Sequence, residues 1–205
     1  MKWLAVALLV FGLGAVQPAY ADVEKDCREL SDTKAQIAAC TTWIASAPKD
    51  AERYLRRGIA YRGTGGDHKK AIEDFSTVIK LTPNSLKAYE LRGSSRGIIN
   101  DNAGAVADYT AAIALEKKSD PKADLSGYYS LRAAQLKSQG KFDAALADYS
   151  ELIRLNPRDA NQLVYRADIY EKKGDKARAI ADYRRALEID PASSYAKDAL
   201  KRLGQ

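Results

Sequence analysis

The stretch Leu163–Pro191, LVYRADIYEKKGDKARAIADYRRALEIDP, contains two helical periods on either side of Gly174-Asp175. Gly174 suits the left-handed residue that ends a helix, Asp175 suits the N-cap of the next helix, and Pro191 stops that helix. Apolar residues recur at helical spacing in both halves, so each half has one apolar face: Leu163, Ala167 and Tyr170, then Ala179, Tyr183, Ala186 and Leu187. The stretch therefore predicts a hairpin of two helices whose apolar faces meet.

The same pattern occurs four times along the chain, with a repeat length of about 34 residues. The first half of each copy has an arginine followed by a small residue, in Arg57-Gly58, Arg92-Gly93, Arg132-Ala133 and Arg166-Ala167. The second half has an alanine and, four residues later, an aromatic ring, in Ala71 and Phe75, Ala105 and Tyr109, Ala145 and Tyr149, and Ala179 and Tyr183. Three copies close on a proline, at Pro83, Pro157 and Pro191. Small residues at the repeated position indicate closely approaching helices.

These registered residues resemble the tetratricopeptide repeat (TPR) over residues 51–193. The resemblance implies an all-α fold, a right-handed superhelix of antiparallel helix pairs (a TPR-like α-solenoid). Its four repeats would cover about 51–85, 86–119, 126–159 and 160–193. It also implies that the first helix of each pair lines a concave groove, because members of this family are mostly protein-binding scaffolds.

Two departures from the pattern lie in the second copy. Arg96 stands where other copies have a ring or a leucine, and the copy ends at Lys117 without its proline. In the additional segment 117–125, either the helix runs on past Glu116 or a loop bulges, and Pro121 favours a break by that point. The final residues, 194–205, do not repeat a second helix and are expected to form a capping helix.

The chain opens with MKWLAVALLVFGLGAVQPAYA, one basic residue followed by an apolar run that ends in an A-x-A pattern. This pattern predicts a signal peptide over 1–21, cleaved after Ala21, with an uncleaved anchor as the alternative. Cleavage leaves 184 residues and removes one lysine, so the formal net charge falls from +6 to +5. We expect an exported protein with no membrane span after cleavage, periplasmic in a bacterium or otherwise secreted. Basic and acidic residues alternate, which argues against nucleic acid as a partner.

Residues 22–50 are expected to form a truncated hairpin, with helices from about Val23 to Leu30 and Lys34 to Ala45. Cys27 and Cys40 lie thirteen residues apart, as Tyr170 and Tyr183 do, so both cysteines replace ring positions of the template. Adjacent antiparallel helices in an oxidising compartment can bring such residues within disulfide reach. The alternative is a pair of buried free thiols.

An aspartate lies sixteen or seventeen residues after each repeated arginine, at Asp74, Asp108, Asp148 and Asp182. A catalytic site would not recur four times, so we expect inter-helix ion pairs that fix the register. The single histidine, His68, lies in the Gly63–Gly66 turn region and lacks a second histidine to complete a metal site. No phosphate loop or acid-base pair is recognisable, so we predict no enzyme, no metal and no cofactor.

The groove implied by the family geometry takes first-helix residues between the packing positions, namely Leu55, Arg56, Ile59, Glu90, Leu91, Ser94, Ser130, Ala134, Lys137, Val164, Tyr165 and Asp168. Their mixed chemistry suits a peptide segment of another protein, with apolar side chains as anchors and charges setting orientation. Tyr165 and Asp168 do not recur, so they are the best candidates for what is particular to this protein. The predicted function is an interaction scaffold of the cell envelope. The alternative is a self-assembling structural or envelope-assembly component, and a homo-oligomer is compatible with both.

Overall fold

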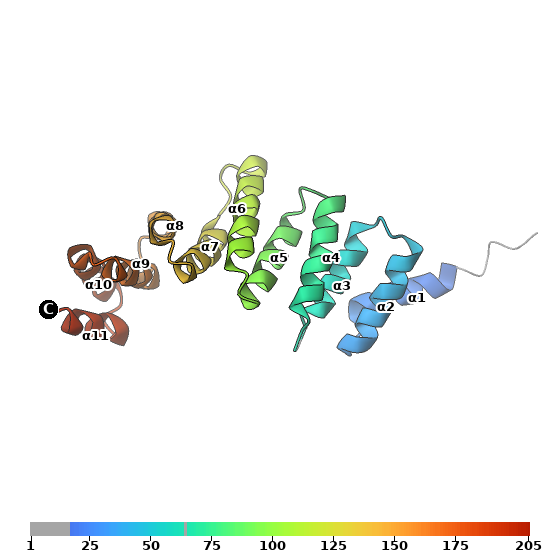
Figure 1. Cartoon of the computed structure of the whole chain (residues 1–205), viewed down its shortest axis with the longest axis horizontal. Coiled ribbons are helices and arrows are strands. Elements are labelled where there is room, and N and C mark those ends of the chain that lie inside the picture. Colours follow the sequence, from blue (N-terminus) through green and yellow to red (C-terminus); the bar gives the residue numbers. More distant parts are fainter. Residues whose placement is uncertain (1–16, 64) are drawn as a thin grey trace, which may run out of the picture. The chain divides into compact units, whose positions relative to one another are not determined.

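The computed structural model describes residues 17–63 and 65–205, with side chains from residue 22 onward. Residues 1–16 of the expected signal peptide lie outside the described residues. The described part is helical, with no strand in it. In chain order the helices are α1 Gln17–Glu29, α2 Thr33–Ser46, α3 Ala51–Tyr61, α4 His68–Leu81, α5 Leu86–Ile98, α6 Asn102–Ser119, α7 Ser126–Ser138, α8 Phe142–Leu155, α9 Ala160–Lys172, α10 Lys176–Ile189 and α11 Ser194–Arg202 (Figure 1).

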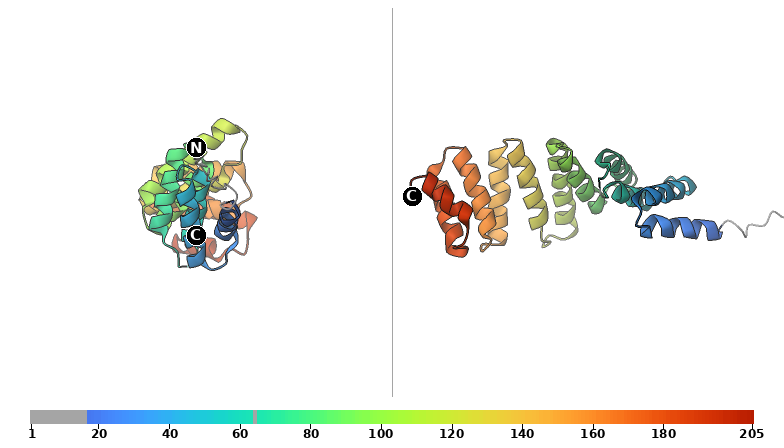
Figure 2. Two further views of the ribbon diagram at one scale, coloured as in Figure 1. Left: turned by 90° about the vertical axis from the view of Figure 1, so that its right-hand side faces the viewer. Right: turned by 90° about the horizontal axis from the view of Figure 1, so that it is seen from below.

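The helices form consecutive antiparallel pairs joined by short turns, which is the arrangement of a TPR-like α-solenoid (Figures 1 and 2). The chain divides into two compact units, Met1–Leu81 and Thr82–Gln205. The first unit contains α1–α4, in which α1 packs on α2 and α3 on α4. The second unit contains α5–α11, in which the pairs α5–α6, α7–α8 and α9–α10 are followed by α11 packed on α10.

The turn between α9 and α10 has the chemistry that its sequence predicts. Gly174 has φ +80°, the left-handed conformation that a residue with a side chain rarely adopts. Asp175 then caps α10, because its side chain accepts a hydrogen bond from the Arg178 backbone N–H at 3.1 Å. In the second repeat Asn100 takes the left-handed conformation, with φ 62°. Asparagine is among the few residues other than glycine that adopt this conformation readily.

The small residue after each repeated arginine allows two helices to pack closely. A Cβ atom on Gly58 would lie 2.6 Å from the ring of Phe75, and one on Gly93 would lie 3.0 Å from the ring of Tyr109. The glycines therefore leave room for the rings of the paired helices. In the third and fourth repeats Ala133 and Ala167 occupy this position and are completely buried.

The first unit begins with a hairpin tied by its two cysteines. The Sγ atoms of Cys27 and Cys40 lie 2.10 Å apart, and both residues pack with Trp43 in a small core. The indole of Trp43 lies between two guanidinium groups, those of Arg28 and Arg53, 5.5 and 4.8 Å from its centre. The expected start of the first helix at about Val23 was wrong, because α1 begins at Gln17. Pro18 is tolerated there because the first N–H groups of a helix have no partner within the helix.

The additional segment of the second repeat is a longer helix followed by a packed loop. Helix α6 runs on past Glu116 to Ser119 and ends before Pro121, so the first of the two predicted conformations is the correct one. Leu125 then turns inward, with 6% of its surface exposed, and joins the core of the third repeat. The segment 120–125 is thus anchored to the second unit by its own apolar side chains.

No helix in the described part of the chain is long and apolar enough to cross a bilayer.

Candidate functional site

The repeated arginines and aspartates form the framework that holds each helix pair. Every pair forms a two-pronged contact in which the guanidinium donates through Nε and Nη2 to both carboxylate oxygens. The shortest distance is 2.7 or 2.8 Å in Arg57–Asp74, Arg92–Asp108, Arg132–Asp148 and Arg166–Asp182. The aspartates are buried. The predicted pairing of these residues is present in all four repeats.

Arg57, Arg132 and Arg166 each also contact the preceding hairpin. The arginine Nη1 donates to the hydroxyl of the residue that follows the ring position of that hairpin. The hydrogen bonds are Arg57 to Thr41 at 3.3 Å, Arg132 to Thr110 at 3.1 Å and Arg166 to Ser150 at 3.1 Å. The hydrogen bond to the aspartate raises the pKa of Arg57, Arg132 and Arg166, while burial lowers it less. Each of these arginines therefore joins three helices and fixes how successive hairpins stack.

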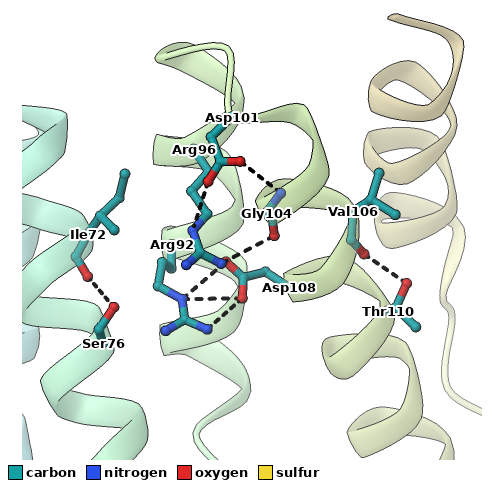
Figure 3. A network of polar contacts seen from close by, with 9 residues as sticks. All are labelled: Ile72, Ser76, Arg92, Arg96, Asp101, Gly104, Val106, Asp108 and Thr110. Atoms are coloured by element: carbon teal, nitrogen blue, oxygen red, sulfur yellow. Dashed lines mark hydrogen bonds and ion pairs between the residues drawn. The ribbon is translucent and has the colours of Figure 1, made fainter. Parts of the chain in front are cut away.

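The second repeat has an extended version of this framework, shown in Figure 3. Asp108 accepts from Arg92 at 2.7 Å and also from Nη1 of Arg96 at 2.8 Å. Arg96 additionally donates to the Gly104 carbonyl at 3.3 Å and lies 3.4 Å from Asp101, which caps α6. Arg96, which replaces the ring or leucine of the other copies, is thus part of the framework, and its sequence position alone did not predict this role.

In the first unit, the predicted groove residues lie on α3. Ile59 is 41% exposed, whereas Leu55 and Arg56 are half-buried. Arg56 is engaged on its own helix, because its Nε lies 2.6 Å from Glu52. Of these three side chains, Ile59 therefore offers the most apolar surface.

In the second repeat, the predicted groove residues on α5 differ in exposure. Glu90 is half-buried and pairs with Lys87 at 3.2 Å, and Ser94 is half-buried. The assignment of Leu91 was wrong, since only 7% of its surface is exposed and its side chain is unavailable to a partner. The equivalent residues of the next two repeats, Leu131 and Tyr165, are exposed. Burial of a leucine side chain such as that of Leu91 stabilises the fold by roughly 1.5–3 kcal/mol.

The predicted residues of the third and fourth repeats come together in two adjoining hollows of the second unit, which we call the α7–α11 groove. The larger hollow has a volume of about 640 Å³ and is lined by Ser130, Ala134, Lys137, Ser138, Tyr149, Tyr165 and Lys172. The smaller has a volume of about 360 Å³ and is lined by Lys137, Asn161, Val164, Tyr165, Asp168, Ser193 and Tyr195. Lys137 and Tyr165 line both, so the hollows share these two side chains as a common wall. All six predicted residues of α7 and α9 line this groove.

The centre of the groove is organised by a charged pair between the two first helices. The Nζ of Lys137 on α7 lies 2.5 Å from Asp168 on α9. Asp168 also accepts a hydrogen bond from the Tyr195 hydroxyl on α11, at 3.4 Å. Three helices thereby meet at one carboxylate, which holds the wall of the smaller hollow in place.

The tyrosine rings that line the groove each pack against another tyrosine ring. The centroids of Tyr149 and Tyr165 lie 5.8 Å apart, and those of Tyr183 and Tyr195 lie 6.3 Å apart. Burial raises the pKa of Tyr149 to about 12, with smaller contributions from Tyr165 and Asp168. Burial also raises the pKa of Tyr195, and the nearby carboxylate of Asp168 adds to this effect. The phenols of Tyr149 and Tyr195 therefore offer hydrogen-bonding groups and apolar faces without negative charge.

Sequence reasoning missed the contribution of α11 to this groove. The segment 194–205 was expected only to cap the solenoid, yet Ser193 and Tyr195 line the smaller hollow. A signal for this was present, because Tyr195 lies four residues after Pro191 as Asn161 lies four after Pro157, and Asn161 lines the same hollow. Helix α11 thus stands where the first helix of a further repeat would begin.

The described residues offer no group of three or more His, Cys, Asp or Glu side chains placed to hold a metal ion. The chemistry of the groove is that of binding, with hydroxyls, ammonium groups, rings and one paired carboxylate.

Comparisons with known proteins agree with this architecture. Two family models described as tetratricopeptide repeat match residues 54–85 and 131–194. A crystal structure of the MamA protein, 25% identical, superposes with a TM-score of 0.71 over 85% of this chain and 91% of that one. Human sperm-associated antigen 1 is 34% identical over 105 residues, 50% of this chain. The co-chaperone DNJ1 of Cryptococcus neoformans, named for tetratricopeptide repeats and a J domain, is 23% identical over 94% of this chain. The chain spans 11% and 38% of the lengths of these two relatives.

Proposed function

Because this chain belongs to the tetratricopeptide repeat family, we propose that it is a non-catalytic scaffold of the cell envelope that holds a peptide segment of a partner protein in the α7–α11 groove. TPR proteins bind peptides or proteins through preformed surfaces, and the α7–α11 groove is such a surface in this chain. The single observation that carries this proposal is the convergence of Ser130, Ala134, Lys137, Val164, Tyr165 and Asp168 on two adjoining hollows.

The groove is suited to binding because its walls are fixed before a partner arrives. The Arg132–Asp148 and Arg166–Asp182 pairs hold the two hairpins, and the Lys137–Asp168 pair joins their first helices. A preformed groove loses little conformational entropy on binding, so more of the contact energy contributes to affinity. Recognition by shape and hydrogen bonding is therefore sufficient, and no chemical step is required of these residues.

The cell-envelope part of the proposal is supported by the N-terminal sequence and the cysteine pair. The A-x-A pattern that ends at Ala21 would place the mature N-terminus at Asp22. The pairing of Cys27 with Cys40 suits a compartment in which disulfides form and persist. N-terminal sequencing of the product recovered from the periplasm of an expressing bacterium should begin DVEKDC. A product that retains Met1 in the cytoplasm would contradict export.

The groove assignment is tested by site-specific photo-crosslinking in intact cells. A photoreactive amino acid placed at Tyr165 or Ala134 should capture a protein that is then identified by mass spectrometry. The matched control positions are Ala144 and Ala181, exposed residues on the second helices α8 and α10. A synthetic peptide from the captured protein should then bind purified residues 22–205, and Ala134→Trp, which fills the larger hollow, should abolish that binding. Capture from Ala144 and Ala181 instead would overturn the groove assignment.

A further inference from the structure

The larger hollow of the α7–α11 groove has an uneven distribution of charge. Its lining includes two lysines, Lys137 and Lys172, and no aspartate or glutamate. Lys172 is exposed and has no ion-pair partner among residues 17–63 and 65–205. One carboxylate contacts the lining, that of Asp168, which pairs with Lys137 at 2.5 Å, and Glu171, the neighbour of Lys172 in the sequence, pairs with Arg202 at 2.9 Å. The larger hollow therefore carries an excess of positive charge.

Lys137 can serve an incoming anion without leaving Asp168 unsatisfied. Its ammonium group has three N–H donors, of which Asp168 occupies one, and its side chain remains 29% exposed. Asp168 keeps the hydroxyl of Tyr195 as a second donor. The hydroxyl of Ser130 lies in the same lining and can donate as well, whereas that of Ser138 donates to the Ala134 carbonyl at 3.1 Å. A carboxylate entering the larger hollow thus finds two ammonium groups and the hydroxyl of Ser130.

The smaller hollow has a different character. Tyr165 and Tyr195 are 45% and 50% exposed, unusually high for large rings, and Val164 is half-buried beside them. Tyrosine is enriched among the residues that contribute most to protein interfaces, because it supplies a rigid apolar surface with a polar end. This wall suits an aromatic or aliphatic side chain.

We propose that the partner segment carries an aspartate or glutamate next to an aromatic or aliphatic residue. The carboxylate binds Lys172 and Lys137 in the larger hollow, and the apolar side chain packs against Val164, Tyr165 and Tyr195 in the smaller one. This inference rests on the proposed function and adds the chemistry of the segment to it. Since Lys137 and Tyr165 line both hollows, neighbouring side chains of one extended peptide can occupy them together.

The test is a selection from a phage-displayed library of random twelve-residue peptides on immobilised residues 22–205. Parallel selections use Lys137→Gln/Lys172→Gln, Tyr165→Ala/Tyr195→Ala, and the groove-filling variant Ala134→Trp. The matched control is Lys176→Gln/Lys197→Gln, which removes the same charge from exposed positions outside both hollows. Thermal unfolding followed by circular dichroism confirms that each variant is folded before its selection is compared.

We expect the pool selected on the wild-type protein to be enriched in acidic residues adjacent to aromatic or aliphatic ones. The acidic enrichment should disappear on Lys137→Gln/Lys172→Gln, and the apolar enrichment on Tyr165→Ala/Tyr195→Ala. Synthetic peptides from the pool should bind the lysine variant about tenfold or more weakly, as expected for the loss of charge-assisted hydrogen bonds. They should bind the control variant within about twofold of the wild type, because neither lysine lines a hollow and both are exposed to solvent, which weakens their interaction with the peptide.

Two outcomes distinguish a failure of the acidic specificity from a failure of peptide binding in the groove. Peptides that are neutral or basic, yet fail to bind Ala134→Trp, would overturn the acidic specificity and leave the groove as a peptide site. Peptides that bind Ala134→Trp as well as the wild type, or a selection without enrichment, would overturn both.

Discussion

The guanidinium of Arg132 donates through Nε and Nη2 to the two carboxylate oxygens of Asp148, at 2.9 and 2.7 Å. Asp148 is buried, so removal of Arg132 leaves a carboxylate that water solvates poorly, and removal of Asp148 leaves a guanidinium with only 19% of its side chain exposed. We expect Arg132→Ala and Asp148→Ala each to lower the free energy of unfolding by about 3 kcal/mol, with a coupling energy of about 1–3 kcal/mol in the double variant. Urea unfolding of the four proteins measures this cycle.

The matched control for that cycle is an ion pair on the surface. Arg154 and Glu151 lie 2.8 Å apart, one turn from each other on α8, with 68% and 43% of their side chains exposed. Solvent screens such pairs, so their coupling energy should be no more than about 0.5 kcal/mol. A coupling energy for Arg132 and Asp148 no larger than this control would contradict a structural role for the repeated pair.

The double contact at Asp108 predicts that the second repeat tolerates the loss of its arginine better than the third. In Arg92→Met the carboxylate still accepts from Arg96 at 2.8 Å, whereas in Arg132→Met no second arginine takes over at Asp148. Arg92→Met should therefore destabilise the protein by about 1 kcal/mol less than Arg132→Met. The double variant Arg92→Met/Arg96→Met should cost more than the sum of its single variants in urea unfolding. Additive losses would mean that the two arginines act independently.

The Cys27–Cys40 link predicts a stability that depends on redox conditions. It closes a loop with a sequence separation of 13 and holds α1, the first described helix, against α2. In Cys27→Ser/Cys40→Ser the free energy of unfolding should fall by about 3 kcal/mol, and dithiothreitol should have no further effect. Reduced wild-type protein should match that variant. Mass spectrometry that finds two free thiols in the exported protein would contradict the prediction.

Repetition explains which parts of the molecule were predictable from the sequence. An interaction that recurs at a separation of sixteen or seventeen residues, such as Arg166 with Asp182, can be recognised in the sequence because four copies must satisfy the same geometry. The cysteine pair was predictable for the same reason, since both residues take ring positions of the template. The groove residues of α7 and α9 were predicted from the geometry of the family that the sequence resembles, and they line two adjoining hollows.

The features that sequence reasoning missed occur once each and depend on local packing. Leu91 is buried and Leu131 is 42% exposed, although both precede the repeated arginine, because burial depends on neighbours that the register does not specify. Arg96 joins Asp108 because an arginine at the ring position is long enough to reach the buried carboxylate. Tyr195 enters the groove because α11 packs on α10 as the first helix of a further repeat would.

The raised pKa of Tyr149 predicts a loss of stability in alkaline solution. Its side chain is buried, with 4% of the residue exposed, and burial raises its pKa to about 12. An unfolded chain ionises its tyrosines near pH 10, so between about pH 10 and 12 the unfolded state loses a proton that folded Tyr149 retains. The contribution of Tyr149 is therefore complete below about pH 10 and declines towards pH 12, by roughly 2–3 kcal/mol. Guanidinium unfolding at pH 8 and pH 11 should show a smaller decline for Tyr149→Phe than for the wild type. Equal declines would mean that Tyr149 ionises as readily in the folded protein as in the unfolded chain.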